Sequence, residues 1–135
     1  MQILEAAVST VKAGNVKMKR AYEAAEPTDG IRILVDRLWP RGVSKDEAAV
    51  DQWMKDVAPS TELRKWFGHD PDRWDEFCKR YVAELEQHPD QLKELRELAR
   101  KSPITLVYSA RDETHNDAVV LRDFILRRVK SVDHE

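Results

Sequence analysis

The sequence predicts an α/β fold: a single domain with a small, mainly parallel sheet flanked by helices. Two short aliphatic runs, residues 31–35 and 104–108, have the composition of strands that are buried on both faces. Between and after these runs, apolar residues recur at helical spacing. Alternation of strands with helices favours parallel pairing, because a parallel connection needs a long crossover segment.

Length and composition limit the class of protein. The chain has 135 residues, which suits one domain with a single core. Charged residues make up 36% of the sequence, yet the net charge is only −2, which disfavours nucleic acid and anionic membranes as partners. Cys78 is the single cysteine and excludes an internal disulfide. Because there is no signal-peptide pattern and no apolar run of about 18 residues, we expect a cytoplasmic protein without a membrane span.

The first third of the chain is expected to hold an amphipathic strand before the buried one. Residues 16–22 alternate apolar and basic side chains, as in a strand with one solvated face. Residues 1–14 have the apolar spacing of a helix, although a strand over 8–11 is also possible. A turn cluster at 26–30 leads into the strand over 31–35.

Helix signals follow the first buried strand. Ser44 and Glu47 match a capping box. The helix expected after it would present four apolar residues on one face: Val50, Trp53, Met54 and Val57. A short strand over 50–53 is the alternative. Further along, Ser60 is the expected N-cap of a short helix that Gly68 closes.

Three longer helices are expected in the second half of the chain. Asp70 and Pro71 begin the first, whose apolar stripe runs from residue 74 to 85. A second amphipathic helix covers 92–99. After the strand over 104–108, a polar loop leads to a capping box at Thr114–Asp117 and to a last helix that extends to Val129.

Both buried strands end in polar residues, and ligands of open α/β sheets bind beyond the carboxyl ends of the strands. If the two strands are parallel neighbours, their exits lie side by side. That edge would then gather a set of candidate site residues: Asp36, Arg37, Trp39, Arg41, Ser109, Arg111, Asp112, His115 and Asn116.

This set suits an anionic ligand. Guanidinium groups bind phosphate or carboxylate in bidentate fashion, and the start of the last helix would add free N–H groups and positive dipole. If the site is catalytic, Asp36 or His115 would transfer the proton. A structural reading stands beside each role: Asp36 and Arg37 could only pair with neighbours, His115 and Asn116 could only serve the helix start, and Trp39 either plugs the sheet edge or stacks on a ligand.

Other chemistries find little support. His69 and His88 have no companions at ligand spacing, so that no metal site is expected. No glycine loop could cradle a phosphate, and no cofactor can be named. Ser109 could be a nucleophile, but its surroundings match no nucleophile elbow.

Several segments together resemble a bacterial family of unknown function, the YeaO-like proteins (domain of unknown function, family 488). The segments are Val-Asp-Arg-Leu-Trp-Pro-Arg-Gly at 35–42, Ala-Pro-Ser at 58–60 with Leu63-Arg64 and Trp66-Phe67, His69-Asp70-Pro71 with Trp74 and Phe77, Arg80-Tyr81, and Thr105-Leu106 through Tyr108-Ser109-Ala110 with Asp112 and Asn116. They cover about residues 16 to 127. The resemblance implies an α/β domain over 16–135 behind an N-terminal extension over 1–15, and it implies no reaction.

Two classes of function remain open. The first is a small-molecule site, of uncertain catalytic status, for an anionic ligand at the strand ends. The second is a non-catalytic module that binds protein or nucleic acid, including a transcription-related role of the kind with which some relatives are labelled. Its motivation is the aromatic content and the basic stretch at residues 17–20. A homodimer through an amphipathic helix is compatible with either.

Overall fold

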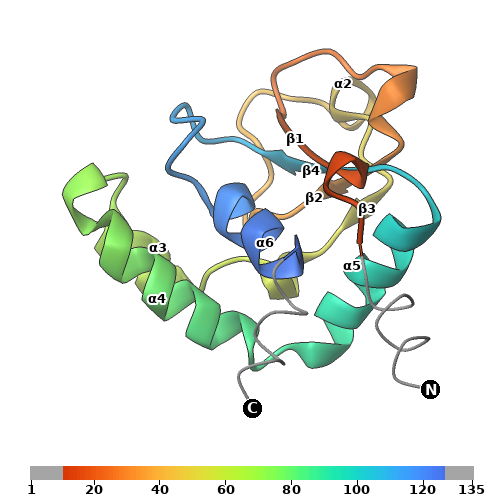
Figure 1. Cartoon of the computed structure of the whole chain (residues 1–135). Helices are drawn as coiled ribbons and strands as arrows, with labels where there is room; N and C mark the ends of the chain where they lie inside the picture. Colours follow the sequence, from red (N-terminus) through yellow and green to blue (C-terminus); the bar gives the residue numbers. More distant parts are fainter. Residues whose placement is uncertain (1–10, 127–135) are drawn as a thin grey trace, which may run out of the picture.

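A four-stranded parallel sheet lies at the centre of the computed structural model, which describes residues 11–126 (Figure 1). Its strands are β1 (Val16–Arg20), β2 (Ile31–Leu34), β3 (Gln52–Trp53) and β4 (Ile104–Tyr108), in the order β1-β4-β2-β3. β4 pairs in parallel with both β1 and β2. The predicted fold class is therefore confirmed, and the two buried runs are indeed neighbours.

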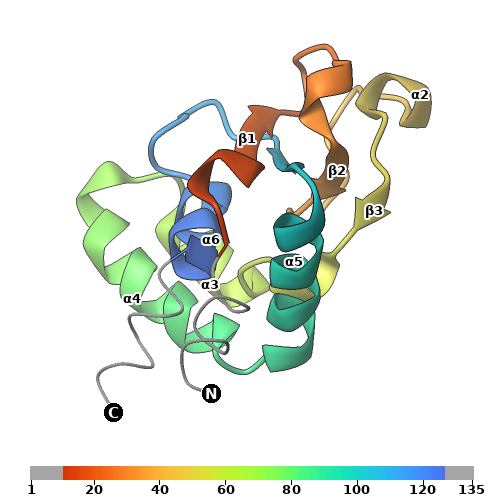
Figure 2. The same ribbon diagram turned by 45° about the vertical axis from the view of Figure 1, so that its right-hand side comes forward.

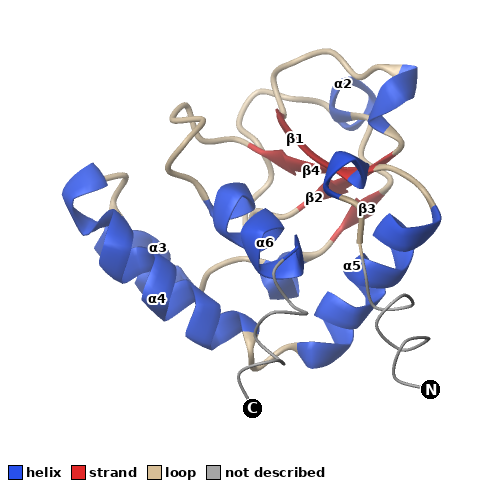
Figure 3. Ribbon diagram, in the orientation of Figure 1, coloured by secondary structure: helices blue, strands red, loops and turns tan. Residues whose placement is uncertain are grey.

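The longer helices gather on one side of this sheet, and α2 (Lys45–Ala48) lies on the other (Figures 1 and 2). They are α3 (Thr61–Phe67), α4 (Trp74–Leu85), α5 (Pro89–Lys101) and α6 (Asp117–Leu126). Short 3-10 turns join the elements at Ala13–Asn15, Pro27–Asp29, Lys55–Val57 and Pro71–Arg73. Figure 3 shows that long loops connect the sheet to the helices.

Successive residues of the central strands point into two separate cores. Ile33 and Leu106 face the helices and belong to the main core. Leu34 and Val107 face the other way and pack with Ala21 in a smaller cluster. All four strand residues are fully buried, and burial of such a side chain contributes about 1.5–3 kcal/mol. Burial on both faces explains why these strands read as continuous aliphatic runs.

Several predicted helix ends are confirmed. The Ser60 hydroxyl accepts a hydrogen bond from the Leu63 N–H, and Gly68 closes α3 in the left-handed conformation. The Asp70 carboxylate accepts from the Asp72 N–H. The 3-10 turn that begins at Pro71 then leads directly into α4.

The prediction of a helix after the Ser44 capping box is correct for the first turn and wrong beyond it. The capping box is present, but α2 ends at Ala48 because Ala49 adopts a left-handed φ of 49°. The chain then forms β3, as the alternative strand interpretation proposed. Pairing with the open edge of β2 decides this, since the Met54 N–H donates to the Leu34 carbonyl. Trp53 is consequently 36% exposed instead of facing a helical core.

The beginning of the chain also differs from expectation. β1 is a strand as predicted, but its basic side chains are not simply solvated: the Lys19 side chain is only 15% exposed, whereas Met18 on the other face is 36% exposed. The helix or strand predicted within residues 1–14 falls mostly on residues 1–10, which lie outside the described part of the chain. The described remainder has only the 3-10 turn Ala13–Asn15.

The last helix begins with a different cap from the one expected. The Asn116 side-chain oxygen accepts from the Val119 N–H at 3.1 Å and so caps α6. Thr114, the predicted cap, instead places its hydroxyl 3.0 Å from the Asp112 carboxylate. An amide at position 116 stands closer to the first helical turn, which explains why it is the cap. The predicted extension to Val129 lies outside the described residues.

A buried ionic cluster lies at the amino end of the sheet, on the face away from the long helices. We call it the amino-end cluster; it consists of Lys19, Asp29, Arg32 and Thr105. An Asp29 carboxylate oxygen lies 2.7 Å from the Arg32 guanidinium and the Asp29 carboxylate 3.2 Å from the Lys19 amine. Arg32 also donates to the Ala48 carbonyl, and the Thr105 hydroxyl donates to the Asp29 carbonyl. Every charge in the cluster therefore has a partner.

Candidate functional site

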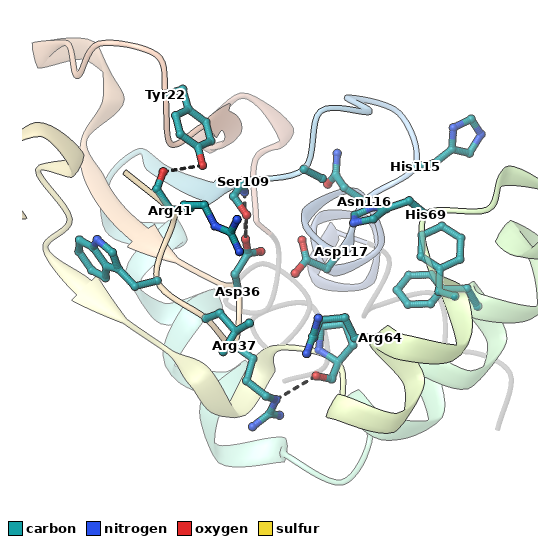
Figure 4. A pocket seen from close by; sticks show the side chains of 16 residues that line it. Tyr22, Asp36, Arg37, Arg41, Arg64, His69, Ser109, His115, Asn116 and Asp117 are labelled. Carbon is teal, nitrogen blue, oxygen red and sulfur yellow. Dashed lines mark hydrogen bonds between the residues drawn. The ribbon is translucent and has the colours of Figure 1, made fainter. Parts of the chain in front are cut away.

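A cleft of about 300 Å³ opens beyond the carboxyl ends of β2 and β4, beside the start of α6 (Figure 4). Its walls come from residues 36–39 and 41 after β2, residues 109–110 and 115–117 after β4, and parts of α3 and α4. Tyr22, Pro59 and His69 also line it. The volume is at the lower end of the range of small-molecule sites. The position is that of ligand sites in open parallel sheets.

Ser109 joins the exits of the two central strands. Its backbone N–H and its hydroxyl both donate to the same carboxylate oxygen of Asp36, at 2.9 and 2.7 Å. Because the carboxylate receives two donors, its orientation at the floor of the cleft is fixed. Asp36 and Ser109, which the sequence placed at neighbouring exits, are thus in direct contact.

Asp117 brings a second carboxyl group to the same place. It is the first residue of α6, it hydrogen-bonds to Asp36, and the two side chains face each other in Figure 4. Removal from bulk water, and next the adjacent Asp36 charge, raise the pKa of Asp117 well above its usual range. We call these two residues the carboxyl pair. The pair retains a proton at a pH where an isolated aspartate has lost it.

The arginines near the cleft fall into two groups. The Arg37 guanidinium donates to the Pro59 carbonyl at 3.1 Å and so fastens the β2 exit to the chain before α3. Arg41 and Arg64 also line the cleft, but among residues 11–126 neither guanidinium has a hydrogen-bond or ion-pair partner. In Figure 4 Arg41 extends toward Asp36, while Arg64 reaches in from α3. Two cationic groups are therefore left open to a ligand.

His115 is held by its own loop. Its Nδ1 lies 2.9 Å from the Asp112 carboxylate, and its ring packs edge-on against Trp74 with 5.0 Å between centroids. The backbone N–H of Thr114, with His115 as a further donor, lowers the pKa of Asp112 to about 2. Figure 4 shows the His115 ring turned away from Asp36. The two predicted proton-transfer residues thus line one cleft without forming a dyad.

The other predicted residues have varied positions. Asn116 lines the cleft, where it is buried as the cap of α6. Trp39 lines it too; its indole N–H donates to the Val43 carbonyl and its ring lies 5.4 Å from that of Trp53, centroid to centroid. Arg111 is exposed and is not among the lining residues.

Sequence reasoning missed several residues that line the cleft, and four of them bear on its chemistry: Asp117, Arg64, Phe67 and Phe77. Asp117 was read only as part of a capping box, although its place directly after Asn116 was a signal that it sits at the site. Arg64, Phe67 and Phe77 come from α3 and α4, and no pattern in the sequence places those helices beside the strand exits. The two phenylalanine rings stack with centroids 4.4 Å apart and form an apolar wall.

Among residues 11–126 there is no group of three or more His, Cys, Asp or Glu side chains that could hold a metal ion. No helix in the same part of the chain is long and apolar enough to cross a membrane. The polar groups that line the cleft are carboxyl, guanidinium, hydroxyl, imidazole and amide groups.

A family model described as the inactive DUF488-N3 subclade matches residues 15–135. The chain belongs to the YeaO-like DUF488 family. The uncharacterised protein YeaO of Escherichia coli is 50% identical over 111 residues, which cover 82% of this chain and 96% of that protein. An uncharacterised protein of Mycobacterium tuberculosis strain H37Rv is 45% identical over 115 residues, 85% of this chain and 97% of its own length. No solved structure matches.

The resemblance read from the segments of the sequence is therefore confirmed, and the YeaO-like relatives carry no named activity. The segments that carried it surround the cleft: Asp36, Arg37 and Arg41 lie in the first, and Ser109 and Asn116 in the last.

Proposed function

We propose that this YeaO-like protein binds a small molecule in the cleft through an anionic group, with Arg41 and Arg64 as the guanidinium donors. The observation that carries the proposal is that both arginines line the cleft while neither guanidinium group has a partner among the described residues. By contrast, the guanidinium groups of Arg32 in the amino-end cluster and of Arg37 in the cleft wall already have acceptors. Planar donors without acceptors suit a phosphate or a carboxylate.

The start of α6 supports anion binding less than the arginines do. The Asn116 side chain already accepts from the Val119 N–H, and the Asp117 carboxyl group accepts from its own N–H and that of Ala118. The first N–H groups of the helix are therefore satisfied from within. This leaves the arginines as the donors on which the proposal depends.

The proposal assigns binding and no reaction. The matching family model is described as an inactive subclade, and this supports a role that needs no turnover. Asp36 and His115 stay predicted as proton-transfer groups, and their separation within the cleft gives no support to a joint catalytic role.

The basic stretch that motivated nucleic-acid binding is engaged internally. The Lys17 amine contacts the Thr28 carbonyl, Lys19 pairs with Asp29, and Arg20 donates to the Ala110 carbonyl at 2.9 Å. Charges with internal partners release few counterions from a polyanion. This observation supports the small-molecule proposal over the alternative.

Thermal unfolding in the presence of inorganic phosphate, sulfate or acetate tests the proposal. A ligand that binds only the folded state stabilises it by RT ln(1 + [L]/Kd), about 2.7 kcal/mol at a hundred times Kd. We expect the wild type to be stabilised in a concentration-dependent way and the double variant Arg41→Ala/Arg64→Ala to lose the response. Arg100→Ala, a change in α5 away from the cleft, is the matched control and should respond as the wild type does. Equal responses of the wild type and the double variant would contradict the proposal.

A further inference from the structure

The carboxyl pair contains hydrogen-bond acceptors that face the cleft. Each carboxyl group offers about four lone-pair positions. The donors to the pair are the N–H and hydroxyl of Ser109, which bond to Asp36, and the N–H groups at the start of α6, which bond to Asp117. Both residues line the cleft, and two carboxyl groups have more acceptor positions than these donors fill. A ligand that excludes water from the cleft must supply donors to them, because a buried acceptor without a donor is costly.

We propose, on the basis of the anion-binding role above, that the ligand is a polyhydroxylated small anion of the sugar-phosphate or sugar-acid class, whose hydroxyl groups donate to Asp36 and Asp117 while its anionic group binds Arg41 and Arg64. The cleft then offers acceptors for the hydroxyl groups of such a molecule and guanidinium donors for its anionic group. A hydroxyl group is also an acceptor, so that it can receive a hydrogen bond from the shared proton of the pair.

The charge of the cleft favours hydroxyl groups over an ammonium group as the donors. Arg37, Arg41 and Arg64 all line the cleft together with the carboxyl pair, and the raised pKa of Asp117 favours a proton on that residue. An ammonium group would have to displace that proton and would then sit among three cations. A hydroxyl group brings no charge and leaves the proton in place.

The apolar wall suits the rest of such a molecule. Phe67 and Phe77 stack with 4.4 Å between ring centroids, and both line the cleft. The carbon–hydrogen face of a polyol or sugar ring can pack against an aromatic ring while its hydroxyl groups point to polar partners. The cleft volume of about 300 Å³ limits the ligand to a small molecule.

The experiment uses calorimetric titration of the full chain with matched pairs of probes that differ in their hydroxyl groups. The phosphate pair is glycerol 3-phosphate and propyl phosphate, with glucose 6-phosphate and cyclohexylmethyl phosphate as a larger pair; the carboxylate pair is gluconate and hexanoate. We expect at least one hydroxylated probe to bind about tenfold or more tightly than its alkyl partner, the effect of one or more hydrogen bonds to a charged group. The pair in which this occurs identifies phosphate or carboxylate as the anionic group.

Variants connect the effect to the carboxyl pair. Asp117→Asn should reduce the affinity for the hydroxylated probe about tenfold more than the affinity for its alkyl partner, whereas Arg41→Ala/Arg64→Ala should reduce both. Repeating the titration in buffers of different ionisation enthalpy measures proton release: we expect close to none for the hydroxylated probe, and for phosphoethanolamine weaker binding or release of a proton.

The outcomes separate the two proposals. If alkyl and hydroxylated probes bind equally, or phosphoethanolamine binds more tightly than glycerol 3-phosphate, the assignment of hydroxyl groups to the carboxyl pair is wrong while anion binding stands. If neither member of any pair binds, and phosphate and acetate do not stabilise the fold, both the anion site and the inference that rests on it are overturned.

Discussion

The charged side chains at the two ends of the sheet differ in whether they have partners. At the amino end, Lys19, Asp29 and Arg32 form ion pairs at 2.7 and 3.2 Å, and the cluster is nearly closed to solvent, with Asp29 and Arg32 side chains 6% and 4% exposed. At the carboxyl end, the cleft brings together two carboxyl groups that repel when both are ionised and two arginines without partners. Charged side chains gather at both ends of the sheet, but only at the amino end does each of them have a partner of opposite charge.

The paired charges at the amino end stabilise the fold, whereas the guanidinium groups without partners at the carboxyl end are available to a ligand. A buried ion pair is costly to break, because the remaining partner is left without compensation. A cationic group without a partner adds nothing comparable to the stability of the fold. We therefore expect substitutions at the two ends to have different consequences, and four changes test this.

The largest effect is expected from Arg32→Met in the amino-end cluster. The change leaves the Asp29 carboxylate buried with the Lys19 amine and the Glu26 N–H as its remaining partners. We expect a loss of roughly 3–5 kcal/mol in the free energy of unfolding, measured by urea denaturation. Arg41→Met, the same change in the cleft, should alter the free energy of unfolding by no more than about 0.5 kcal/mol. Similar losses for both variants would remove the distinction between the two ends.

The next effect is the pH dependence that Asp117 gives to stability. Its pKa lies well above the ordinary value of 3.8 in the folded state, so that between these two values the folded state holds a proton that the unfolded state has lost. The free energy of unfolding should therefore fall as pH rises above about 4, by at most ~1.4 kcal/mol per pH unit. Asp117→Asn should flatten this part of the curve.

The matched control for that measurement is Asp123→Asn, which changes an exposed aspartate of the same helix. Urea denaturation of the three proteins at a series of pH values gives the slopes. If Asp117→Asn and the wild type have the same slope, the carboxyl pair does not hold a shared proton.

A smaller effect of opposite sign belongs to Asp112. Its pKa is lowered from 3.8 to about 2, chiefly by the Thr114 N–H and further by His115. Its contribution to stability is therefore present above about pH 4 and is lost as pH falls toward 2. In a carbon-13 titration of the carboxyl groups, we expect the midpoint of Asp112 near 2 and a rise in His115→Ala that stops short of the ordinary value. A midpoint near 3.8 in the wild type would contradict this loop geometry.

The smallest change in stability is expected from Arg41→Ala/Arg64→Ala. Because neither guanidinium has a partner among residues 11–126, the free energy of unfolding should stay within about 0.5 kcal/mol of the wild type for each change. Arg37→Ala sharpens the comparison, since it removes the donors to the Pro59 and Ala58 carbonyls and should cost about 1–3 kcal/mol. If Arg37→Ala and Arg41→Ala/Arg64→Ala have the same free energy of unfolding as the wild type, the Arg37 guanidinium is as available to a ligand as that of Arg41.

Much of the sheet and part of the cleft could be predicted from local patterns. The aliphatic runs that became β2 and β4, and the caps at Ser60 and Gly68, depend on residues near one another in the chain. The parallel pairing of β2 with β4 also placed Asp36 next to Ser109, a contact between residues 73 positions apart. This prediction succeeded because two exits of adjacent parallel strands lie at the same edge of the sheet.

Other features could not be read from the sequence because they depend on what packs where. The segment at Gln52–Trp53 carries an apolar pattern compatible with helix or strand, and the open edge of β2 decided for a strand. The placement of α3 against α4 decided that Arg64 and Phe67 reach the cleft. The residues next to these segments in the sequence predict neither outcome, because each depends on contact with a segment far away in the chain.

The sequence by itself determined the family, the fold class and the edge of the sheet at which polar residues gather. Only the tertiary structure decided which of those residues have partners: it fastened Arg37 to the backbone, turned His115 toward Asp112, and left Arg41 open in the cleft. It also paired Asp36 with Asp117. The physical reason is that the type of a side chain is fixed by the chain, whereas its hydrogen-bond partners and its pKa depend on the groups that folding brings within a few ångströms.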